Sequence, residues 1–197
     1  MVRLRLLMTK GMVCVLMAAN MAGMGVPVQA KVAKMAKTTS ANPYKLYKKA
    51  PKKVVRKFVA SNGKIVKVKN IPGNPGYYQG NHSWTYSGSL ETSENKITLN
   101  TLKVKHVTYH ELGHALAFMY WAEREDYSAP FPDETTEWKR IYKKEKKKYR
   151  FENSKYVKSN SSEFFAQCFA TYCLHKKAMK KTMPRSYRYV KKVIKKL

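Results

Sequence analysis

Residues 110–114 read His-Glu-Leu-Gly-His and lie in a segment whose apolar pattern is helical. Histidines four positions apart share one helix face, so both imidazoles can bind the same metal ion. Glu111 lies about 100° around the helix from His110, close enough to hold a water beside that ion. Neutral imidazole is a preferred ligand of Zn²⁺, and a third protein ligand leaves one coordination position open for water. The pentapeptide therefore predicts a catalytic zinc site in which Glu111 takes a proton from water.

Two histidines on a solvent-exposed, charged helix would be the alternative explanation of this pattern. The flanking residues predict a largely buried helix instead, because they are apolar: Leu112, Ala115, Leu116, Phe118 and Met119. Two imidazoles and a carboxylate on a buried helix are costly unless they bind something. His106, one turn before His110, is expected to pack beside the site rather than to bind the ion.

The third ligand must come from elsewhere in the chain. The metzincin pattern requires a Gly and then a His shortly after His114, but Ala117 and Tyr120 hold those positions, which excludes that class. Three acidic residues in polar stretches are predicted to be solvated: Glu123, Glu134 and Glu145.

Glu163 differs because it opens a strongly apolar helical segment, residues 163–170. A carboxylate there is costly unless a cation or a metal ion pairs with it. Asn160 offers a second role, since as a helix N-cap it would place Glu163 at the third helical position of a capping box. Ala166, one turn later, leaves room for the histidine-bearing helix to approach. The residues alone leave Glu163 as a metal ligand, a cap, or both.

Together these features resemble the zinc-binding domain of anthrax toxin lethal factor and the secreted Pro-Pro endopeptidases, which are gluzincin metallopeptidases. The resemblance rests on the His110 pentapeptide and on Glu163-Phe-Phe-Ala, 49 positions after His114, and covers roughly residue 51 to the C-terminus. It implies one Zn²⁺ held by His110, His114 and Glu163, with Glu111 as general base. It also implies that Tyr156, seven residues before Glu163, donates a hydrogen bond to the oxyanion.

The resemblance implies a secreted zinc endopeptidase acting on a peptide or protein substrate. The Pro-Pro branch has a second carboxylate directly before the ligand Glu, where this sequence has Ser162, so the prediction does not extend to Pro-Pro specificity. We expect the substrate to add as a strand along residues 96–100, predicted as an edge strand. Two other functions are compatible with the sequence: an inactive zincin scaffold, or a cationic protein that binds polyanions.

The elements that must position these residues predict an α+β, zincin-like fold. It has a small N-terminal sheet with an edge strand, then the active-site helix, then a mainly helical C-terminal half. Alternating β-branched residues predict strands at 64–69 and 96–100, and residues 71–89, rich in Gly, Asn, Ser and Tyr, are predicted as loop and irregular strand. Helical patterns cover five segments: 52–60, 102–124, 133–150, 161–177 and 187–197.

The composition excludes several protein classes. Apolar residues make up 44% of the 197 residues, too many for a wholly disordered chain, and three cysteines exclude a disulfide-dense mini-domain. Cys168 and Cys173 are predicted as buried thiols rather than a bridge or a metal pair.

Residues 1–30 have the layout of a secretory signal peptide, which predicts an extracellular protein with no stable membrane span after cleavage. Residues 31–50 are predicted as a basic tail or short pro-segment, and 51–197 as the metallopeptidase domain.

The charge is large and unevenly placed. The sequence has 40 Lys and Arg against 12 Asp and Glu, a net charge of +28. All acidic residues lie between Glu91 and Glu163, so both ends of the chain are purely cationic. We therefore expect affinity for an anionic cell-wall polymer or surface. No recognised nucleic-acid motif accompanies the lysines, so specific nucleic-acid binding is not expected, and the sequence leaves the oligomeric state open.

Overall fold

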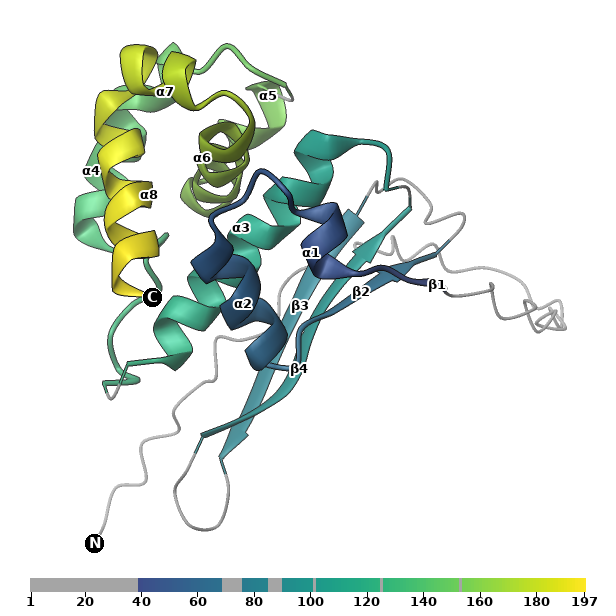
Figure 1. Ribbon diagram of the computed structural model, residues 1–197. Coiled ribbons are helices and arrows are strands. Elements are labelled where there is room, and N and C mark those ends of the chain that lie inside the picture. The colour runs from purple at the N-terminus through teal and green to yellow at the C-terminus, as the bar shows by residue number, and fades with distance from the viewer. Residues whose placement is uncertain (1–38, 69–75, 85–89, 101, 125, 153) are drawn as a thin grey trace, which may run out of the picture. The chain divides into compact units, whose positions relative to one another are not determined.

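A four-stranded mixed sheet occupies the N-terminal part of the protein (Figure 1). The computed structural model describes residues 39–68, 76–84, 90–100, 102–124, 126–152 and 154–197, so the predicted signal segment lies outside the described residues. The strands are β1 (Thr39–Ser40), β2 (Lys64–Lys67), β3 (Gly76–Trp84) and β4 (Leu90–Leu99). Their order is β1-β2-β4-β3, with β2 parallel to β4 and the two outer pairs antiparallel. Ile65 pairs with Ile97 in register, and both side chains are buried.

The predicted edge strand is an internal strand in this sheet. Residues 96–99 belong to β4, which lies between β2 and β3, so the prediction of an edge at 96–100 is wrong. The outer strand next to β4 is β3. The glycines of β3 give this segment a composition that is typical of a loop. A Cβ added at Gly80 would lie 2.9 Å from Phe118 Cδ2 on the helix below, so this glycine serves close approach of strand and helix.

Eight α-helices complete the described residues and confirm the predicted α+β class with a mainly helical C-terminal half. They are α1 (Pro43–Leu46), α2 (Lys52–Ala60), α3 (Lys105–Ala122), α4 (Thr136–Glu145), α5 (Ser154–Val157), α6 (Ser161–Leu174), α7 (Lys176–Thr182) and α8 (Pro184–Lys196). The helix predicted at 161–177 is divided, because the backbone of His175 leaves the helical region at φ −133°. Within the described ranges, no helix combines the length and apolar character needed to cross a bilayer.

Helix α3 is the centre of the fold, with the sheet on one side and α6 on the other (Figure 1). This position explains why it is apolar nearly all around: Leu112, Ala115 and Leu116 are fully buried. Beyond it, Trp138 of α4 stacks on Phe164 of α6 with ring centroids 5.7 Å apart. These contacts fix α6, which carries Glu163, against α3. Cys168 is a buried free thiol and Cys173 a partly buried one, so neither forms a disulfide.

Part of the segment predicted as a tail packs into the domain. Residues 35–197 form one compact unit, and β1 pairs with β2 through Thr39 and Ser40. Tyr47 is 1% exposed and packs edge-on against Tyr109 of α3, with ring centroids 5.4 Å apart. The folded unit therefore begins before residue 51, since burial of Tyr47 stabilises this segment on α3.

Glu145 is buried, contrary to the prediction that it is solvated. It is 1% exposed at the end of α4, and its carboxylate accepts hydrogen bonds from the backbone N–H groups of Arg185 (3.2 Å) and Ser186 (2.8 Å). The Ser186 hydroxyl donates a third, at 2.7 Å. Glu145 thus caps the start of α8 from another helix, a role invisible in its polar sequence neighbourhood. Glu123 and Glu134 are exposed, as predicted.

Candidate metal centre

The structure brings three predicted ligands together from two helices. His110 and His114 lie one turn apart on α3, and Glu163 lies in the first turn of α6. Glu163 Oε2 is 2.9 Å from His110 Nε2 and 3.5 Å from His114 Nε2, and the two Nε2 atoms are 3.2 Å apart. In a tetrahedral zinc site with bonds of 2.0–2.1 Å, ligand atoms are separated by about 3.3 Å. The donor set and its spacing therefore fit a zinc ion.

Gly113 of α3, which has no side chain, allows the three candidate ligands to converge. A Cβ added at Gly113 would lie 2.7 Å from both Cα and the carbonyl oxygen of Ala166. No real side chain tolerates such a contact, so the backbones of α3 and α6 approach as closely as Gly permits. The expectation that the helices come close at Ala166 is confirmed, with Gly113 as the partner.

Gln167 orients the first histidine. Its Oε1 lies 2.9 Å from His110 Nδ1, and its side chain is buried at 1% exposure. An amide oxygen only accepts, so His110 carries its proton on Nδ1 and presents the Nε2 lone pair to the other two ligands. Sequence reasoning missed this residue. A signal was available, since Gln167 lies one turn after Glu163 and is a polar side chain in the most apolar helix.

Glu163 follows the predicted N-cap of α6, and its carboxylate lies among the candidate ligands rather than returning to the cap. Asn160 is the N-cap of α6, and its Oδ1 accepts a hydrogen bond from the Glu163 backbone N–H at 2.8 Å. The carboxylate points to the histidines. Burial would raise the pKa of this carboxyl, but the adjacent imidazoles of His110 and His114 outweigh burial and hold its pKa well below the ordinary value. Glu163 is therefore ionised where a metal ligand is needed.

Glu111 lies on the neighbouring face of α3, 6% exposed. Burial raises the pKa of its carboxyl above the ordinary value, and the nearby His114 and His110 oppose the rise only in part. The backbone N–H of Tyr78 hydrogen-bonds to the carboxylate and links Glu111 to the edge strand β3. A buried carboxylate of raised pKa beside two imidazoles is arranged to exchange a proton.

A comparison with known protein families gave a match. The family model described as "Anthrax toxin lethal factor, N- and C-terminal domain" matches residues 77–193. The chain belongs to this family. The matched part of the lethal-factor-like chain begins in β3, ends in α8 and includes every predicted site residue. A comparison with curated proteins gave no match.

Tyr156 lies at the solvent side of the lethal-factor-like site. It is on the short helix α5, its ring centroid is 6.4 Å from that of His110, and it is 58% exposed. Tyr156 thus lies next to one candidate ligand and is open to solvent. His106 does not belong to the group of candidate ligands in the described residues.

A second carboxylate lies close to the candidate centre without being a ligand. Asp133, 6% exposed, accepts a hydrogen bond from the Ser162 hydroxyl through Oδ2 and from the Ser161 hydroxyl through its backbone carbonyl (2.8 Å). Burial would lower the pKa of His114, but Glu163, Glu111 and Asp133 together raise it. Ser162 therefore has the carboxylate of Asp133 beside it, and Asp133 belongs to the segment before α4. Sequence reasoning missed Asp133 because the contact crosses 29 positions.

Proposed function

We propose that this lethal-factor-like protein is a zinc-dependent endopeptidase. The observation that carries the proposal is the convergence of His110, His114 and Glu163 within 4.8 Å of one another, with buried Glu111 on the same helix. The family model covers two domains of the toxin, so membership alone does not supply catalysis. The support comes from an intact donor set and an intact acid–base residue in one place.

The proposed mechanism assigns each residue a task. When bound by the three ligands, zinc would polarise the scissile carbonyl and acidify a neighbouring water. Glu111 takes the proton of the attacking water and passes it to the leaving amine, and its raised pKa makes it a better base than an exposed carboxylate. Tyr156 donates its hydroxyl hydrogen to the developing oxyanion. Gln167 holds His110 in the required tautomer.

We place the substrate on β3, in place of the internal strand first expected. β3 is the outer strand of the sheet, and its residue Tyr78 hydrogen-bonds to Glu111. An extended peptide added to this edge would pass the candidate metal centre. Edge pairing uses every second residue of the added strand, so N-methylation of single amides in a cleaved peptide should slow cleavage at alternate positions. Equal effects at all positions would contradict strand addition.

The function is tested by separating metal binding from turnover. Glu111→Gln should keep one zinc per chain, by elemental analysis, and lose at least about 10²-fold in cleavage of a peptide library. Glu163→Gln should lower the zinc content, and Glu134→Gln, an exposed acid elsewhere, should change neither. An active Glu111→Gln protein would refute the mechanism. A wild-type protein that binds zinc but cleaves nothing would identify an inactive scaffold.

We also propose that the protein acts outside the cell, on the basis of residues 1–30. Expression in a secretion-competent host should yield a medium fraction whose N-terminus, by mass spectrometry, lies near residue 31. Retention of the full-length chain in the cell would contradict this proposal without affecting the peptidase proposal.

A further inference from the structure

Helices α4 and α8 form a groove whose lining includes none of the candidate ligands. They run antiparallel, because Glu137 near the start of α4 pairs with Lys192 late in α8 (2.6 Å), whereas Glu145 at the end of α4 bonds the start of α8. The groove has a volume of about 470 Å³. It is lined by Glu137, Arg140, Ile141, Lys144, Arg185, Arg188, Tyr189 and Lys192.

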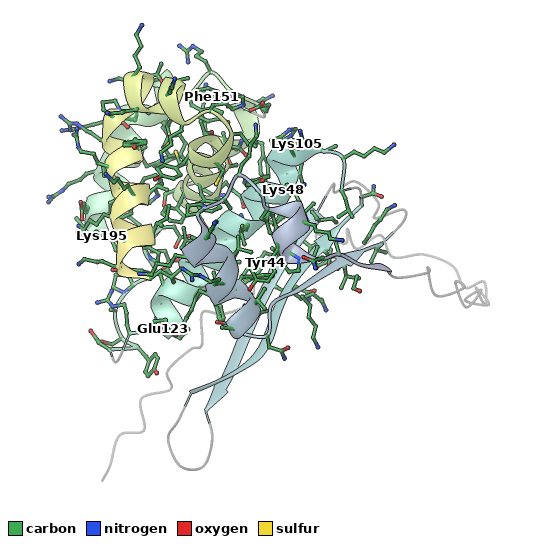
Figure 2. All side chains as sticks on the ribbon, viewed as in Figure 1. Tyr44, Lys48, Lys105, Glu123, Phe151 and Lys195 are labelled. Atoms are coloured by element: carbon green, nitrogen blue, oxygen red, sulfur yellow. The ribbon has the colours of Figure 1, made fainter. Side chains whose placement is uncertain are left out.

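The lining residues have the same spacing on both helices. Positions 137, 140, 141 and 144 of α4 match positions 185, 188, 189 and 192 of α8, and each set forms one continuous helical stripe. Five of the eight residues are cations and one is an acid. Ile141 is half-buried and Tyr189 is 5% exposed, so the floor is apolar and the two walls are cationic. Nitrogen-tipped side chains project around these helices in Figure 2.

Four of the five cations on the walls are not neutralised. In the part of the chain that the structure describes, Arg140, Lys144, Arg185 and Arg188 form no ion pair. The nearby acids serve other contacts: Glu145 turns inward as the cap of α8, and Glu137 pairs with Lys192 at the end of the groove. Like charges at helical spacing repel one another. An anion in the groove would relieve this repulsion.

We propose that the α4–α8 groove binds a linear poly(alditol phosphate), a polymer of phosphodiesters joined by short polyol linkers. A phosphodiester can accept hydrogen bonds from cations of both walls through its two unesterified oxygens. Along α8, the cations follow one another at axial rises of about 4.5 and 6 Å, so the groove presents a row of positive charge to a linear polyanion. The carbon linkers would contact the apolar floor.

The groove is poorly suited to single-stranded nucleic acid. Proteins that bind single-stranded nucleic acid without sequence preference use exposed aromatic rings on which the bases stack. The aromatic residue in the groove is Tyr189, which is nearly buried and whose hydroxyl donates to the Pro132 carbonyl at 2.7 Å. The groove also contains none of the candidate ligands, so its function is independent of the peptidase proposal.

The test compares salt dependence of binding between charge-matched variants. Labelled poly(glycerol phosphate) is titrated with the full-length protein by fluorescence anisotropy at several salt concentrations. Arg185→Gln/Arg188→Gln and, on the other wall, Arg140→Gln/Lys144→Gln should each lower the slope of log K against log salt by about 1.5. The control Lys177→Gln/Lys180→Gln removes the same charge from exposed positions of α7 and should lower the slope by no more than about 0.5.

Each other outcome overturns the proposal. An equal loss in the α7 control would show diffuse attraction to the whole surface. Binding of oligothymidylate or poly-glutamate as tight as that of poly(glycerol phosphate), at the same salt and charge number, would assign the groove to another ligand class. Thermal unfolding verifies that each variant folds, and the two walls provide independent variants. Glu111→Gln should bind the polymer like the wild type, because the groove is unchanged in this variant. Polymer binding is therefore tested separately from the peptidase proposal.

Discussion

The proton on His110 Nδ1 is the smallest feature on which the candidate centre depends. Rotation or tautomer change of this ring would turn a proton, rather than a lone pair, toward Glu163 and His114. The hydrogen bond to Gln167 prevents this, and its complete burial protects it from competing water.

Replacement of Gln167 by Ala should therefore weaken zinc binding by about 10- to 100-fold, as loss of such supporting contacts typically does. Competition with a chromophoric chelator measures this affinity. Gln167→Glu, which keeps an acceptor oxygen, should restore most of it. Thr171→Val, one turn further along α6 and equally buried, is the control. Unchanged zinc affinity in Gln167→Ala would reduce the residue to a packing role.

Tyr156→Phe removes one hydroxyl from an exposed side chain and should leave the fold and zinc content intact. If this hydroxyl stabilises the oxyanion, kcat should fall by about 10²- to 10³-fold with little change in KM. Tyr44→Phe changes a similarly exposed tyrosine on α1 and should have no effect. A parallel rise in KM with unchanged kcat would indicate substrate binding instead of transition-state stabilisation.

At the scale of elements, the contact of α3 with α6 decides whether three ligands meet. Gly113→Ala normally favours a helix by about 1 kcal/mol. Here the added methyl would lie 2.7 Å from the Ala166 backbone, so we expect net destabilisation of about 1–3 kcal/mol and weaker zinc binding. Chemical denaturation and chelator competition measure the two effects. Ala166→Gly should not rescue the variant, because the clash involves backbone atoms; rescue would place the contact elsewhere.

The cap of α8 by Glu145 is a second contact between elements with a measurable stability. Its carboxylate accepts three hydrogen bonds from Arg185 and Ser186, so Glu145→Ala should lower the free energy of unfolding by about 2–3 kcal/mol. Glu137→Ala, which breaks an exposed ion pair on the same helix, should cost less than about 1 kcal/mol. Equal losses in urea denaturation would contradict the capping role.

These elements also show what the sequence could predict. Helix positions and the histidine pair follow from periodicity along the chain, and the cost of an unpaired carboxylate in an apolar helix predicted Glu163. The roles of Gln167, Asp133 and Glu145 depend on contacts across elements, which local pattern does not contain. The sequence predicts loop and irregular strand where β3 lies, because the glycines of β3, needed for close approach to α3, are also typical of turns.

For the whole molecule, zinc would join the two structural parts of the domain. His110 and His114 lie on the helix that covers the sheet, and Glu163 begins a helix of the C-terminal half. Without a cation, three polar groups 2.9–3.5 Å apart must be held together by packing of α3 and α6 alone. Zinc should therefore stabilise the native state as a whole.

Free zinc at 1,000 times its Kd should add about 4 kcal/mol, or roughly 10 °C in Tm for a domain of this size. Calorimetry with zinc and with excess chelator measures the difference. His114→Ala should lose this response, because two ligands remain. Calcium at the same concentration should leave Tm unchanged, since it prefers six or more oxygen ligands. Equal Tm values with zinc and with chelator would mean that the two helices assemble without the ion and that these residues do not form a metal centre.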